Sequence, residues 1–194
     1  MKVLEEYFES NAVISTQEAY NLGISSYQLN KMVKEKYLER VKKGVYKIER
    51  FFEDEFATVA FECEKVVFSH GTALWFLGYS DRIPNIYHIT VPQGYNVSTI
   101  KKRCMQVVVH YVKPEVFELG KTKIKSPFGS DIYIYNAERT ICDIVKNKKH
   151  MDLQIFSDGM KWYFRDRNKN MLNLYKYSDK LNIKNKVLNY VEVL

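Results

Sequence analysis

The stretch that decides the fold, residues 15–48, reads STQEAYNLGISSYQLNKMVKEKYLERVKKGVYKI. It opens with a capping box, in which the Ser15 hydroxyl accepts from the backbone amide of Glu18 while the Glu18 carboxylate accepts from the amide of Ser15. A short helix is expected from there to Leu22, because Gly23 adopts the left-handed conformation that ends a helix without steric cost. A tight turn follows this helix.

A second helix is expected directly after the turn. Ser25 and Gln28 form another capping box, and Ile24 is placed to contact Leu29 as a hydrophobic staple. The apolar residues that begin with Leu29 repeat at the spacing of a single buried stripe. The remaining side of the helix and its first turn carry Ser25, Ser26, Tyr27, Gln28, Asn30, Lys31 and Lys34.

Two β-prone runs, residues 37–41 and 45–48, flank the turn Lys42-Lys43-Gly44 and predict a hairpin. Its basic residues are Arg40, Lys42, Lys43 and Lys47. A helix, a turn, a second helix and a hairpin with a basic tip together predict a winged helix-turn-helix, in which the second helix enters the major groove of DNA and the hairpin rests on the backbone.

The charge is focused on this segment. The whole chain carries a formal net charge of +7, and residues 25–50 hold eight basic against three acidic residues, whereas residues 1–24 hold one against four. Amide side chains such as Asn30 and Gln28 pair with adenine, and lysines contact guanine or phosphate. Although a lysine-rich helix is often only a solvated face, the caps, the hairpin and the charge together favour a double-stranded DNA partner.

Residues 51–194 are expected to form a second domain, separate from residues 1–50. The predicted elements are helices at 51–64, 69–78 (capped by Ser69), 137–148 (capped by Asn136) and within 152–194, and strands at 66–68, 86–91, 106–112, 121–126 and 131–135. The expected fold class is therefore α+β: an N-terminal winged helix-turn-helix followed by a mixed α/β domain with a small, mostly antiparallel sheet and a helical C-terminal end.

No catalytic motif is evident, so no enzymatic activity, cofactor or metal is expected. Cys63, Cys104 and Cys142 lack the close spacing of a zinc site or a disulfide framework and are interpreted as reduced thiols of the core. His70, His88, His110 and His150 are scattered along the chain. Those at 88 and 110 lie on predicted strands and are interpreted as hydrogen-bonded, partly buried histidines rather than bases. No apolar run is long enough to span a bilayer, and the N-terminus does not resemble a signal peptide, so a cytoplasmic protein is expected.

Two basic clusters of the second domain form a candidate interaction surface for RNA, DNA or an acidic protein. They are Lys101, Lys102 and Arg103, and Arg139, Lys146, Lys148 and Lys149. The alternative is that they only increase solubility. Arg139 is also spaced to pair with Asp143 one helical turn later.

Nearly the full layout resembles the AbiEi antitoxins of bacterial type IV toxin/antitoxin, or abortive-infection, systems of phage defence. The resemblance rests on Val13-Ile14-Ser15-Thr16-Gln17-Glu18-Ala19, on the wing Val41-Lys42-Lys43-Gly44-Val45-Tyr46, and on two later stretches, residues 68–78 and 137–143, which contain Ser-His-x-Thr-Ala-Leu and Glu-Arg-Thr.

The resemblance implies an N-terminal domain that represses its own operon by binding inverted repeats in the promoter. It implies a C-terminal antitoxin domain, residues 51–194, that counters a nucleotidyltransferase-like AbiEii toxin without forming a stable complex. Two alternatives stay open on the sequence: a nucleic-acid-processing enzyme that the winged helix targets, and a transcription factor that responds to a small ligand.

Overall fold

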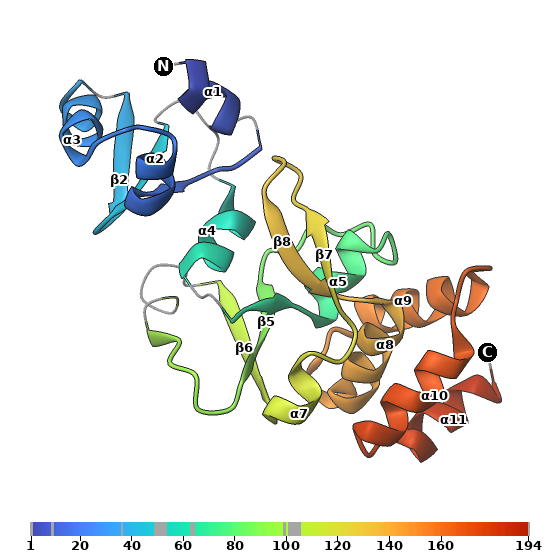
Figure 1. Cartoon of the computed structure of the whole chain (residues 1–194). Helices are drawn as coiled ribbons and strands as arrows, with labels where there is room; N and C mark the ends of the chain where they lie inside the picture. The colour runs from blue at the N-terminus through green and yellow to red at the C-terminus, as the bar shows by residue number, and fades with distance from the viewer. Residues whose placement is uncertain are drawn as a thin grey trace. The chain divides into compact units, whose positions relative to one another are not determined.

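A computed structural model describes residues 2–8, 10–35, 37–48, 54–62, 65–98, 100 and 106–193 (Figure 1). The chain divides into two compact units. Unit 1 holds residues 1–64 and 123–132, and unit 2 holds residues 65–122 and 133–194. The expected domain boundary at residue 50 lies outside the described residues, as do Cys63 and Cys104.

Unit 1 contains the winged helix-turn-helix that the sequence predicts. Its elements are α1 (Lys2–Phe8), β1 (Ile14–Ser15), α2 (Thr16–Asn21), α3 (Ser26–Lys34), β2 (Leu38–Lys42), β3 (Val45–Ile48) and α4 (Glu55–Glu62). The three strands form an antiparallel sheet in the order β1-β3-β2. The sequence did not predict β1, because a strand of two residues is too short to show an alternating pattern.

Both capping boxes are present. The Ser15 hydroxyl accepts from the Glu18 amide at 3.1 Å, and the Glu18 carboxylate accepts from the Ser15 amide at 2.8 Å. Gly23 closes α2 with φ of +79°. The amide of Ile24 then donates to the Ala19 carbonyl at 2.8 Å. Local hydrogen bonding therefore fixes where α2 ends and where α3 begins.

A single apolar core holds the first 48 residues together. Its buried side chains come from α1, β1, α2, α3 and the hairpin: Leu4, Phe8, Ile14, Ala19, Leu29, Leu38, Tyr46 and Ile48. Each helix or strand contributes few of these residues, so no single element would be stable alone. The helices therefore depend on packing against the sheet.

Unit 2 combines one sheet with a group of helices. Its elements are β4 (Val67–Phe68), α5 (His70–Phe76), β5 (Tyr87–Pro92), β6 (Val107–Val112), α7 (Pro114–Phe117), β7 (Lys121–Lys125), β8 (Asp131–Tyr135), α8 (Ala137–Lys146), α9 (Leu153–Arg165), α10 (Met171–Lys180) and α11 (Lys184–Val191). Residues 123–132 of the β7–β8 hairpin are counted with unit 1. Among the described helices, none is long and apolar enough to cross a membrane.

The sheet of unit 2 has the order β6-β5-β4-β8-β7. The fold class agrees with the prediction, but the sheet is mixed rather than mostly antiparallel. Strand β4 runs antiparallel to β5, whereas β5 pairs with β6 and β4 pairs with β8 in parallel. Parallel pairing requires a connection of about a dozen residues or more, and the residues between β5 and β6 provide this length.

Helix α8 is the centre of the helical group (Figure 1). Asn136 caps it as predicted, by accepting from the Arg139 amide at 3.0 Å. All eight residues from Glu138 to Val145 are buried. Among them, Arg139 is 0% exposed and forms an ion pair of 3.0 Å with Asp143. The predicted pair is therefore present, but in the core and not on the surface.

Candidate nucleic-acid interface

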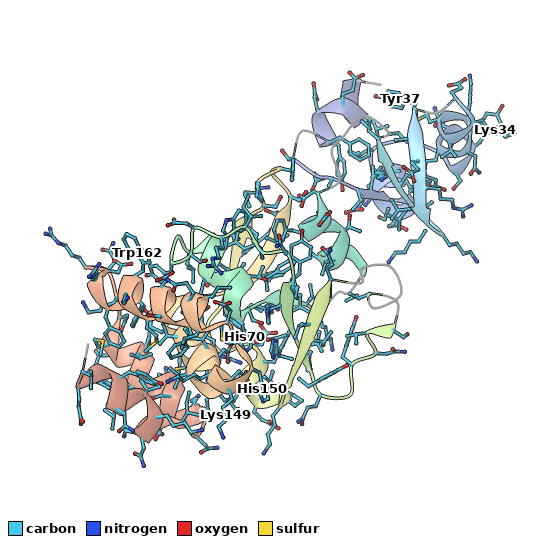
Figure 2. All side chains as sticks on the ribbon, turned by 180° about the vertical axis from the view of Figure 1, so that it is seen from behind. Lys34, Tyr37, His70, Lys149, His150 and Trp162 are labelled. Atoms are coloured by element: carbon cyan, nitrogen blue, oxygen red, sulfur yellow. The ribbon has the colours of Figure 1, made fainter. Side chains whose placement is uncertain are left out.

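Helix α3 presents a continuous polar and aromatic face. Tyr27, Asn30, Lys31 and Lys34 fall within an arc of about 100° around its axis. All four are exposed, Tyr27 to 78%. Figure 2 shows Lys34 on the outer side of unit 1. The ion pair of Lys31 with Glu35, at 3.9 Å and with both side chains more than half exposed, is too weak to hold the lysine away from another anion.

The opposite side of α3 holds the helix in place. Leu29 is fully buried, and Ile24, Met32 and Val33 pack against the same core. This arrangement agrees with the predicted stripe and staple. Because its inner side is fixed, the outer face of α3 is held rigidly for contact with a partner.

In the first turn of α3, the side chain of Gln28 is engaged in the helix cap, whereas the sequence also suggested that it pairs with adenine. The Gln28 side-chain oxygen accepts from the Ser25 amide at 2.7 Å and from the Ser25 hydroxyl at 3.0 Å. Bidentate pairing with adenine would require this cap to open. Asn30, which is exposed on this face and is not part of the cap, is therefore better placed than Gln28 to contact a base edge.

The wing is tied to the start of α2. The Gly44 carbonyl accepts from the Thr16 amide at 2.8 Å and from the Thr16 hydroxyl at 3.1 Å. Gly44 itself has φ of +78°, which a residue with a Cβ adopts only with strain. A register shift between Arg40 and Lys42 bends the hairpin near its tip. These contacts fix the position of the tip relative to the helix-turn-helix.

The four predicted cations of the wing have different surroundings. Arg40 and Lys43 are exposed, and Lys42 is partly buried. The ammonium of Lys47 lies 3.2 Å from the Glu39 carboxylate, and its side chain is only 16% exposed. Lys47 is therefore already partly neutralised, and Arg40 and Lys43 are the stronger candidates for phosphate contacts.

Of the second predicted set, the basic clusters of residues 51–194, only the second cluster lies within the described residues, and one of its members is buried. Lys101, Lys102 and Arg103 lie outside the described residues. Arg139 cannot belong to any surface, because its guanidinium is buried over the Tyr135 ring and bonded to Asp143 and to the carbonyls of Val116 and Leu119. Its inclusion was wrong, since charge patterning does not reveal burial. Lys146, Lys148 and Lys149 are exposed.

Sequence reasoning missed one convergence. His70, His88 and His110, which are scattered along the sequence, lie together in unit 2, with one nitrogen of each within 4.8 Å of the others. Their separations along the sequence carry no signal of this contact. Only the parallel pairing of β5 with β6 could have placed the residues at 88 and 110 on neighbouring strands.

The comparison with solved structures supports the fold. The chain is similar to the crystal structure of the RV2827C protein from Mycobacterium tuberculosis, with a TM-score of 0.60 and 13% sequence identity. The alignment covers 92% of this chain and 70% of that one. No curated protein matches the chain in sequence.

The family comparison concerns the winged segment. Residues 2–48 match the family model of the transcriptional regulators described as AbiEi antitoxin. The match begins at α1 and ends at β3, so it contains the two capping boxes, α3 and the wing. Over this segment, the winged helix-turn-helix, the chain is similar to the AbiEi antitoxin family of transcriptional regulators.

Proposed function

We propose that this protein is a cytoplasmic repressor and antitoxin. It binds double-stranded DNA through α3 and the wing, and autoregulates its toxin/antitoxin operon at inverted repeats in the promoter. Through residues 51–194 it counters a nucleotidyltransferase-like AbiEii toxin without a stable complex, as in type IV phage-defence systems. The observation that carries the DNA-binding part is the exposed face of α3, with Asn30, Lys31 and Lys34, together with the exposed cations Arg40 and Lys43 of the wing.

The chemistry of this surface matches the two tasks of a DNA-binding protein. Lys31, Lys34, Arg40 and Lys43 supply charge to phosphates, which gives affinity and sets the register on the duplex. Asn30 and Tyr27 supply groups that contact base edges or sugar. One such face contacts few base pairs, so two copies on paired half-sites account for a palindromic operator.

The test compares two variants of the whole chain. The triple change of Lys31, Lys34 and Lys43 to alanine removes three exposed cations of the proposed interface. If each neutralises one phosphate, affinity for the upstream DNA falls about 100-fold near physiological salt, and the slope of log affinity against log salt becomes shallower by about 3. Fluorescence anisotropy at several salt concentrations, with scrambled DNA as competitor, measures both quantities.

The matched control changes Lys161, Lys176 and Lys184, which are exposed in unit 2, to alanine. It removes the same charge and is expected to keep most of the affinity. Equal loss in both variants would mean that only net charge matters. Undiminished binding by the folded triple variant of the interface would refute the assignment of this face.

The antitoxin part has its own test. Lys146, Lys148 and Lys149 are the exposed remainder of the predicted antitoxin surface. Changing all three to alanine in the whole chain is expected to abolish rescue of cells that express the neighbouring toxin gene, while promoter binding is unchanged. Full rescue by this variant would show that these three lysines are not part of the antitoxin surface.

A further inference from the structure

Three histidine rings meet in the interior of unit 2. His70 begins α5, His88 lies on β5 and His110 lies on β6. Nδ1 of His88 is 3.0 Å from Nε2 of His110, and the rings of His70 and His110 stack with centroids 3.6 Å apart. Figure 2 shows His70 among the ribbons of this unit.

The sheet brings these residues together. In the parallel pair β5–β6, His88 is opposite Val108 and Thr90 is opposite His110, so both histidines lie on the same face of the sheet, two positions apart. The backbone places His70 beside them, because the Ser69 amide donates to the His88 carbonyl at 2.9 Å and the His88 amide donates to the Thr72 hydroxyl at 2.8 Å.

The backbone of His70 is unusual. Its φ is +50°, in the left-handed region, which is uncommon for residues other than glycine and occurs more often at functional sites than elsewhere. Ser69 precedes it but does not cap α5, contrary to the expectation from sequence. The Ser69 hydroxyl instead lies 2.9 Å from Nδ1 of His70 and accepts from the Thr90 hydroxyl at 2.9 Å.

The outer contacts of His70 orient its ring. Besides the Ser69 hydroxyl, the side-chain amide of Asn147 lies 2.6 Å from Nε2. Both ring nitrogens of His70 are thus engaged, so the ring can bind an ion only when one of these contacts is released, while the other keeps the ring in one tautomer and orientation. The ring is therefore positioned by Ser69, directly before α5, and by Asn147 at the end of α8, and not only by packing.

The surroundings of the three rings favour their neutral form. Burial lowers the pKa of each of them, that of His110 to about 4, and the neighbouring histidines lower the pKa values of His70 and His110 further. Neutral imidazole is the form that donates a lone pair to a metal ion.

A cavity of about 420 Å³ adjoins the cluster. Its walls are mostly apolar, and they include His88, His110 and Asn147 together with the exposed His150. The stacked rings of His70 and His110 must turn out of their parallel arrangement to direct three lone pairs at one ion, and the cavity leaves room for His110 to do so. Water or a small ligand can reach the same point from the cavity.

We propose that His70, His88 and His110 bind a divalent transition-metal ion of the zinc class, with a fourth position open to the cavity. Three imidazoles with one open position match the ligands and tetrahedral geometry that zinc prefers. Nδ1 of His88 and Nε2 of His110 are 3.0 Å apart. This distance is near the separation of about 3.3 Å between two ligand nitrogens in a tetrahedral site with zinc–nitrogen bonds of about 2.0–2.1 Å.

The experiment titrates the untagged whole chain with Zn²⁺ by calorimetry and with Co²⁺ by absorption. One ion per chain is expected, with the visible bands of four-coordinate cobalt. Separate changes of His88 and His110 to alanine are expected to lower the affinity more than about 100-fold, since loss of an outer hydrogen-bond partner alone costs about 10–100-fold. His150→Ala, which changes a histidine of the same cavity outside the cluster, is expected to bind as the wild type does.

Thermal unfolding of each variant shows whether it is folded before its affinity is interpreted. X-ray absorption of the wild-type zinc complex counts imidazole ligands and needs no variant; three are expected. No binding to the wild type, fewer than three imidazoles, or equal weakening by His150→Ala would overturn the proposal.

Discussion

Helices α3 and α8 each carry two basic residues and are both capped at the N-terminus, yet α3 exposes both of its cations whereas α8 buries one, Arg139. In α3 only Leu29 is buried, and Lys31 and Lys34 are in solvent. In α8 eight consecutive residues are buried, and other helices and strands cover Arg139. The difference teaches that a cation on a helix indicates a binding surface only when no other element packs over it.

The largest effect is expected from Arg139. Arg139→Met keeps the volume of the side chain but leaves the carboxylate of Asp143 buried without its partner, so the free energy of unfolding should fall by about 3–5 kcal/mol. Urea denaturation at neutral pH measures this. The exposed Lys146→Met, on the same helix, should change stability by less than about 0.5 kcal/mol.

The double variant Arg139→Met with Asp143→Leu sharpens this comparison. Because neither charge remains, it should regain much of the lost stability. If Arg139→Met alone were as stable as the wild type, Arg139 would not be buried as described. It would then again be a candidate residue of the antitoxin surface.

The next largest loss of stability is expected when a glycine of positive φ is changed to alanine. Gly120 and Gly23 both have positive φ, +76° and +79°, but a Cβ on Gly120 would lie 2.6 Å from the Cβ of Arg139, whereas a Cβ on Gly23 meets nothing within 4 Å. Gly23→Ala should cost about 1 kcal/mol from backbone strain alone. Gly120→Ala should cost clearly more in the same denaturation experiment; equal losses would contradict the tight packing around α8.

The smallest loss of stability is expected from breaking an exposed ion pair, in contrast to the buried pair of Arg139 with Asp143. Asp131 contacts Lys123 and Lys125 at 2.7 and 2.9 Å, with all three side chains 43–58% exposed. Asp131→Asn should therefore cost only about 0.2–1 kcal/mol, and less at high salt. A loss as large as that of Arg139→Met would mean that exposure does not separate the two kinds of pair.

The same pair predicts a pH dependence. Hydrogen bonds from Lys123 and Lys125 hold the pKa of Asp131 below its usual value. The folded state therefore binds the proton less readily than the unfolded state, and the contribution of Asp131 is present above the usual pKa and is lost as the pH falls through the lowered one. Wild type and Asp131→Asn should converge in stability at the acidic end of a pH series.

The elements that could be predicted from sequence are those set by neighbouring residues. The capping boxes at Ser15 and Ser25, the turn at Gly23 and the cap at Asn136 are where the sequence placed them. The exposed residues of α3 followed from helical spacing, because one buried stripe leaves the opposite face exposed. Gln28 was assigned two roles that its oxygen cannot fill at the same time.

The sequence by itself therefore determined the winged helix-turn-helix and the exposed face of α3, because hydrogen bonds within a few residues and a helical repeat are written in the local order of the chain. Only the tertiary structure decided that β5 and β6 pair in parallel, that Arg139 is buried and that three distant histidines meet. These features depend on contacts between segments far apart in the chain, and no local pattern specifies which segments will pack together.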